Sequence, residues 1–111
     1  IMRTWNAFAF TSLWEGMPCS VVEARLLRLP VLTYETGGVR DVMFHGKNGF
    51  VYRQHDWQSL ADGLCTIIED KSLYERLCGF NDDLREFNDK HMVDNYIELY
   101  KSLRCSCERF L

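Results

Sequence analysis

The sequence lacks a long apolar run, is poor in proline and carries no cluster of basic residues. No segment approaches the roughly 20 apolar residues that a membrane-spanning helix needs, so we expect no transmembrane segment. The N-terminal residues also lack the layout of a signal peptide. We therefore expect a cytoplasmic location, or the cytosolic face of a membrane for the full-length protein. A formal net charge of -3 with scattered Lys and Arg excludes nucleic acid as the expected partner.

Cysteine and histidine are present in patterns that do not indicate disulfides or a metal site. The 5 cysteines are odd in number and irregularly spaced, which predicts reduced, mostly buried thiols. Cys105 and Cys107 resemble half a metal site, but without a second pair we interpret them as a chance terminal pair. His45, His55 and His91 have no metal-ligand spacing. We predict neither a metal site nor a cofactor.

What the chain does have is enough apolar residues for a core. Its 111 residues are 47% hydrophobic and 14% aromatic, which fits one compact domain. The chain starts at Ile1 and soon runs into an apolar segment. We therefore expect it to be a piece of a longer protein.

The first half of the chain alternates between predicted strands and helices. Apolar and β-branched residues predict strands at 7–11, 31–34 and 50–52, the first of them buried. Helical spacing predicts a helix over 19–29, and a shorter one follows at 39–45. This alternation is typical of an α/β fold with a Rossmann-like parallel sheet and helices on both faces.

The second half is predicted to be helical. Asp56 is the expected N-cap of a helix whose apolar face carries Trp57, Leu60, Ala61, Leu64, Ile67 and Ile68. Two more helices are predicted over 73–87 and 90–103. The acidic residues Asp82, Asp83, Glu86 and Asp89 are interpreted as the solvated side of a helix.

The first strand, loop and helix form a candidate anion site. In a parallel sheet, ligands bind beyond the carboxyl ends of the strands, where helices begin. The amides of Cys19, Ser20 and Val21 at such a helix start could hold a diphosphate without a basic side chain. Gly16 would let the backbone approach a ligand closely, and Pro18 would stiffen the entry.

Two carboxylates, Glu15 and Glu23, flank this anion site. Carboxylates accept hydrogen bonds from sugar hydroxyls, which a nucleotide sugar offers on both sides of its diphosphate. Glu23 has a structural alternative, because Ser20 and Glu23 also form a capping-box pattern. Glu15 could be a solvated surface acid. Trp14 is interpreted as packing under the loop rather than stacking on a base.

Residues 12–24 (SLWEGMPCSVVEA), with two glutamates eight positions apart, resemble the signature of family 4 retaining glycosyltransferases. Pro30 stands where that family has a proline before its next strand. The segments 36–41 (TGGVRD) and 46–51 (GKNGFV) are similar to its next two glycine loops, in the same order and spacing. Asp41 departs from the family, which usually has glutamate there.

The resemblance implies roles for individual residues. The residue matching Glu15 lies by the transferred sugar and is the implied catalytic residue, and the residue matching Glu23 binds the ribose hydroxyls. The backbone from Met17 to Val21 would face the diphosphate. Gly37 and Gly38 would belong to a neighbouring loop near the cleft. Such enzymes generally work without a bound metal, and their basic phosphate-binding residues lie upstream of the segment present here.

The resemblance implies that residues 1–104 are a partial GT-B C-terminal domain that binds a nucleotide sugar, followed by a tail at 105–111. The parent enzyme would move a hexose, with retention, from a nucleotide-diphosphate sugar to an unidentified acceptor. An N-terminal acceptor domain would be missing, so we expect no transfer by this chain alone. The last helix would reach toward that domain. The alternatives are a non-catalytic nucleotide-sugar-binding module and a GT-B sugar-nucleotide epimerase.

Overall fold

Three short parallel strands form the sheet at the centre of the fold. The computed structural model describes the backbone of residues 1–108 and the side chains of residues 1–104. The strands β1 (Phe8–Phe10), β2 (Val31–Tyr34) and β3 (Gly49–Tyr52) lie in the order β1-β2-β3. Both strand pairs are parallel, which confirms the predicted Rossmann-like sheet. Their carboxyl ends therefore meet at one edge of the sheet.

Strand β2 is the buried centre, whereas β1 is not the buried strand that its composition predicts. All four residues of β2 are buried between two neighbouring strands. In β1, Phe8 and Phe10 are half-buried and Ala9 is exposed. The reason is that β1 has a strand partner on one side only, among the described residues.

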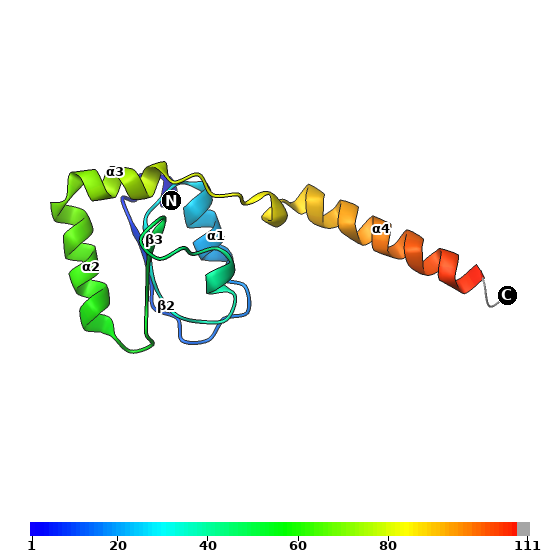
Figure 1. Cartoon of the computed structure of the whole chain (residues 1–111), viewed down its shortest axis with the longest axis horizontal. Helices are drawn as coiled ribbons and strands as arrows, with labels where there is room; N and C mark the ends of the chain where they lie inside the picture. The colour runs from blue at the N-terminus through cyan, green and yellow to red at the C-terminus, as the bar shows by residue number, and fades with distance from the viewer. Residues whose placement is uncertain (109–111) are drawn as a thin grey trace.

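Helices cover both faces of the sheet, as predicted (Figure 1). Successive residues of a strand point to opposite faces, so Val31 and Leu32 enter different cores. Val31 packs with α1 (Cys19–Leu26), while Leu32 packs with α2 (Trp57–Glu69) and α3 (Lys71–Gly79). The sheet is thus the middle of three layers, as is typical of an α/β Rossmann-like domain.

Helix α2 approaches the sheet closely because it carries a glycine. A Cβ atom on Gly63 would lie 1.8 Å from the hydroxyl oxygen of Tyr52, so no larger residue fits there without movement. Burial against this helix raises the pKa of the Tyr52 hydroxyl. Asp56 caps the helix as predicted, accepting a hydrogen bond from the Ser59 amide at 3.1 Å. Trp57, Ala61 and Ile68 do not belong to the buried face as predicted: Trp57 and Ile68 are 67% and 74% exposed, and Ala61 is exposed as well.

Helix α1 ends earlier than the predicted helix over 19–29 because its last turn closes in a left-handed residue. The Arg28 amide donates to the Arg25 carbonyl at 2.9 Å, and the Leu29 amide donates to the Ala24 carbonyl at 3.0 Å. This pair of bonds is the Schellman motif, in which the left-handed position is usually glycine. Here Arg28 occupies it with φ of 59°.

Replacing Arg28 with glycine should therefore stabilise the chain. The left-handed conformation costs a residue with a Cβ roughly 1–2 kcal/mol, and the greater freedom of glycine in the unfolded chain offsets part of that gain. We expect Arg28→Gly to raise the free energy of unfolding by about 0.5–1 kcal/mol in urea denaturation. Arg28→Ala should bring no such gain, and an equal gain in both variants would contradict the explanation.

The predicted helix over 73–87 is wrong in its second half. Helix α3 ends at Gly79, and only a 3-10 turn, η3 (Arg85–Phe87), follows. Asp82 does not lie on the solvated side of a helix but forms a buried ion pair. Its Oδ2 accepts a hydrogen bond from Arg25 Nε at 2.6 Å, with the two side chains 5% and 0% exposed. Asp82 lies in the non-helical segment between α3 and η3, and this segment places its carboxylate next to Arg25. A helix that continued past Gly79 would place the carboxylate at a different position.

Asn48 extends this ion pair into a network. Asn48 is fully buried, and its Nδ2 donates to the Val42 carbonyl at 2.9 Å and to Asp82 Oδ1 at 3.3 Å. Its Oδ1 accepts from the Phe44 amide at 2.9 Å. The network therefore joins α1, the turn before β3 and the segment after α3.

Removing the Asp82 carboxylate should be strongly destabilising. It would leave the Arg25 guanidinium buried without its counter-charge, which costs about 3–5 kcal/mol. Asp82→Ala should lower the free energy of unfolding by that amount in urea denaturation. Asp83→Ala is the matched control, because Asp83 pairs with Arg85 on the exposed surface, where solvent weakens the pair. Equal effects of the two substitutions would contradict the role assigned to the buried pair.

Helix α4 (Asp89–Glu108) projects away from the body, so the described chain measures 66 × 27 × 24 Å (Figure 1). It confirms the predicted last helix and continues past residue 103, whereas its approach to a missing domain stays a prediction. No helix in the described range is long and apolar enough to cross a membrane. The apolar side chains exposed along it are Met92, Val93, Tyr96, Ile97, Leu99, Tyr100 and Leu103.

The cysteines whose side chains are described are free thiols, as predicted, but they are not mostly buried. Cys19 and Cys65 are exposed and Cys78 is half-buried. The interpretation of Cys105 and Cys107 concerns side chains outside the described residues.

Candidate functional site

The start of α1 offers open backbone amides, although fewer than the sequence predicts. The Val21 and Val22 amides both donate to the Pro18 carbonyl, at 3.0 and 3.2 Å. Val21 is also fully buried, so it belongs to the core and its amide is not free for a ligand. In the described part of the chain, the Cys19 and Ser20 amides have no acceptor. The open part of the helix start is therefore these two N–H groups.

The capping-box alternative for Glu23 is wrong. Helix α1 begins at Cys19 with Pro18 as its N-cap, and no side chain caps it. Ser20 is therefore the second helical residue rather than the N-cap that a capping box requires. Glu23 is exposed on the outer side of the helix, and its carboxylate is available to a ligand.

The loop after β1 packs closely against the loop after β2. A Cβ atom on Gly37 would lie 2.6 Å from the Glu15 carbonyl oxygen. One on Gly38 would lie 2.2 Å from the Gly16 carbonyl oxygen, and Gly38 has φ of 69°. These two glycines therefore allow backbone to pack directly against backbone. A Cβ atom on Gly16 would meet nothing within 4 Å, so the glycine there is not needed for packing within the chain.

Ser12 shapes the same loop from inside. Its hydroxyl donates to Glu15 Oε1 at 2.9 Å and also lies 3.2 Å from the Trp14 carbonyl oxygen. The Glu15 carboxylate is therefore turned toward Ser12 rather than bonded to the amides at the start of α1. Trp14 is 86% exposed, so its predicted packing under the loop is wrong. The hydrogen bonds of the Ser12 hydroxyl thus order the loop, while the Trp14 indole is exposed to solvent.

Gln54 is a residue of this region that the sequence analysis missed. Its Nε2 donates to the Leu13 carbonyl at 2.9 Å and to the Glu35 carbonyl at 3.1 Å. The Glu35 carboxylate accepts from Arg40 Nε at 2.6 Å, and this hydrogen bond lowers the pKa of Glu35. A single glutamine after a strand has no sequence signature, since its partners are backbone atoms of distant residues.

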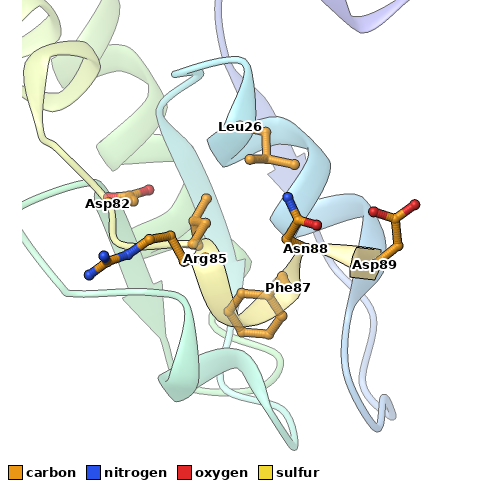
Figure 2. Close-up of a pocket in the computed structure, with 7 residues that line it drawn as sticks. Leu26, Asp82, Arg85, Phe87, Asn88 and Asp89 are labelled. Atoms are coloured by element: carbon orange, nitrogen blue, oxygen red, sulfur yellow. The ribbon is translucent and has the colours of Figure 1, made fainter. Parts of the chain in front are cut away.

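A pocket of about 520 Å³ lies at the opposite end of α1, and it is not the predicted site. It is formed where the segment after α3 passes the last residue of α1, Leu26 (Figure 2). Leu84 and Phe87 add apolar side chains to its lining, and the polar lining residues are Asp82, Arg85, Asn88 and Asp89. None of the sequence-predicted site residues lines this pocket.

A methyl group at Gly38 should disturb the packing of the two loops. Gly38→Ala would force the loops apart, because its Cβ would overlap the Gly16 carbonyl oxygen. We expect the amide resonances of residues 15–17 to shift in NMR spectra while those of α2 stay unchanged. Gly46→Ala is the matched control, since Gly46 also has a positive φ, of 80°, but faces open space. Equal shifts at residues 15–17 in both variants would contradict a specific contact.

Comparison with known families shows the class of protein to which the chain belongs. The family of glycosyl transferases group 1 matches residues 1–78. The chain therefore belongs to the group 1 glycosyltransferases, and the predicted family is confirmed at that level.

Individual relatives are much longer than this chain. It is 32% identical over 72 residues to the capsular polysaccharide biosynthesis glycosyltransferase CapM of Staphylococcus aureus, covering 65% of this chain and 19% of that protein. It is 28% identical over 102 residues to the Escherichia coli UDP-Gal:alpha-D-GlcNAc-diphosphoundecaprenol alpha-1,3-galactosyltransferase, covering 90% of this chain and 26% of that enzyme. The chain therefore spans about a quarter or less of the length of these two relatives.

Solved structures share the fold. HepE of Anabaena, determined in complex with UDP, superposes with a TM-score of 0.76 at 27% identity, covering 91% of this chain and 28% of HepE. HepE has also been determined with UDP-glucose. A sucrose-phosphate synthase from Thermosynechococcus elongatus superposes with a TM-score of 0.78 over 91% of this chain and 26% of its own. Its identity of 22% makes it a likeness of fold alone.

Proposed function

We propose that this chain is the donor-binding part of a family 4-type retaining glycosyltransferase, which moves a hexose from a nucleotide-diphosphate sugar to an acceptor. The observation that carries the proposal is the backbone packing of Gly37 and Gly38 against Glu15 and Gly16, next to two open amides at the start of α1. That edge of the sheet is where parallel α/β folds bind nucleotides. HepE, which shares the fold, binds UDP and UDP-glucose.

The diphosphate would lie at the start of α1. The Cys19 and Ser20 amides would donate to its oxygens, and the partial positive charge of the helix start would favour it. The open space above Gly16 would let the ligand approach the backbone. We propose that no metal takes part, because this helix start and basic side chains of the parent protein would stabilise the leaving diphosphate.

The two glutamates would recognise hydroxyl groups on the two sides of the diphosphate. Glu23 is exposed on α1, beyond the open amides, and would accept hydrogen bonds from the ribose. Glu15 would accept hydrogen bonds from the hydroxyls of the transferred hexose, next to the reacting centre. For this, its carboxylate would leave the Ser12 hydroxyl and accept from the sugar instead.

The proposed role of Glu23 predicts a preference for ribose over deoxyribose. A charge-assisted hydrogen bond to a hydroxyl is worth roughly tenfold in affinity, so UDP should bind about tenfold more tightly than 2′-deoxy-UDP. Glu23→Ala should remove most of this preference, with little change in the affinity for deoxy-UDP. The affinities can be measured by NMR titration, following the amides of residues 16–23.

The control is Glu69→Ala, because Glu69 is an exposed glutamate at the end of α2. It should keep the full preference for UDP. Absence of amide shifts with UDP, GDP and ADP would overturn donor binding by this chain. Binding with an unchanged preference in Glu23→Ala would overturn only the role of Glu23.

A further inference from the structure

We infer that Gln54 is a positioning residue that holds the Glu15 loop in its donor-binding arrangement. Here the Glu15 loop means residues 11–18, after β1, and the Gly37 loop means residues 35–38, after β2. This inference rests on the proposed function and adds to it a residue outside the glutamate signature and the glycine loops. Gln54 touches neither the proposed ligand nor the reacting atoms, and it acts through the backbone of both loops.

The side-chain amide of Gln54 joins the segments that follow all three strands. Gln54 lies just after β3, Leu13 lies after β1, and Glu35 lies directly after β2. One nitrogen donates to both carbonyls, at 2.9 Å to Leu13 and 3.1 Å to Glu35. A primary amide has two N–H groups, so it can satisfy both acceptors at once. Since both partners are carbonyl oxygens, only the nitrogen end of the side chain can face them.

The two loops need such a bridge because the strand pairing stops short of them. The pairing of β1 with β2 ends at Phe10 and Thr33. Beyond those residues the loops meet through the close approach of Gly37 and Gly38, where the van der Waals attraction between each pair of atoms is individually small and has little directional preference. Gln54 adds directional hydrogen bonds. One of them goes to the carbonyl of Leu13, which lies two residues before Glu15.

Hydrogen bonds order the backbone on both sides of Gln54, so the position from which its side chain bridges the loops is well defined. The Asp56 amide donates to the Arg53 carbonyl at 3.1 Å and closes the turn between β3 and α2. His55 in this turn has φ of 67°. Asp56 then caps α2. The position of Gln54 is thus determined by β3 and by the start of α2, both of which belong to the sheet and its helical layer.

The first test compares Gln54 variants without ligand. Gln54→Ala removes both hydrogen bonds, and Gln54→Glu keeps the length of the side chain but replaces its donors with a carboxylate. Both should shift the amide resonances of Gly16, Gly37 and Gly38, with the midpoint of urea unfolding close to that of the unaltered chain. Gln58→Ala is the matched control, because Gln58 is exposed on α2, and it should leave the loop resonances unchanged.

The second test measures UDP affinity in the same variants. Loss of two hydrogen bonds that order the loops should weaken UDP binding roughly three- to tenfold in Gln54→Ala and Gln54→Glu, and not in Gln58→Ala. Unchanged loop resonances, or unchanged UDP affinity with shifted resonances, would overturn the positioning role. If the unaltered chain binds no UDP, the proposed function has failed, and the ligand-free resonances still decide whether Gln54 holds the loops.

Discussion

The buried ion pair between Arg25 and Asp82 is the constraint on which the arrangement of α1 depends. Arg25 lies near the end of the helix whose start carries the proposed donor site, and Asp82 comes from the segment after α3. A buried pair of this kind often adds little net stability over apolar residues, yet it penalises any structure in which one charge is unpaired. Asn48 bonds to Asp82 and to the turn before β3, so the pair joins segments that are distant in the sequence. Together these contacts fix where α1 lies on the sheet.

The opposite end of α1 is organised by backbone contacts instead of charges. Gly37 and Gly38 bring the two loops together, and Gln54 bridges their carbonyl groups. Trp14 is 86% exposed, and a Cβ atom on Gly16 would meet nothing within 4 Å, so the packing of the two loops does not depend on either residue. The proposed diphosphate site would thus consist mainly of backbone, with carboxylates placed to accept from the sugar hydroxyls.

Much of the fold could be predicted from the sequence because the signals are local. The apolar strands, the N-cap at Asp56 and the glycine turns follow from residues close together in the chain, and the parallel sheet follows from their alternation. The predicted helix over 73–87 failed because helical propensity says nothing about Asp82 finding Arg25 at a distance of 57 residues. The predictions that Trp14 packs under the loop and that the Val21 amide is open to a ligand failed for a related reason. The burial of a residue depends on which elements surround it.

The sequence by itself determined the family and the residue types of the candidate site. The two glutamates, the glycine pair and the order of the motifs are properties of the chain, and the proposed donor-binding chemistry rests on these residue types. Only the tertiary structure decided which amides stay open, that Gly37 and Gly38 pack against the Glu15 loop, and that Gln54 bridges the two loops. The physical reason is that hydrogen bonds to backbone carbonyls and close contacts between backbones depend on position in space, and they leave no pattern in the order of the side chains.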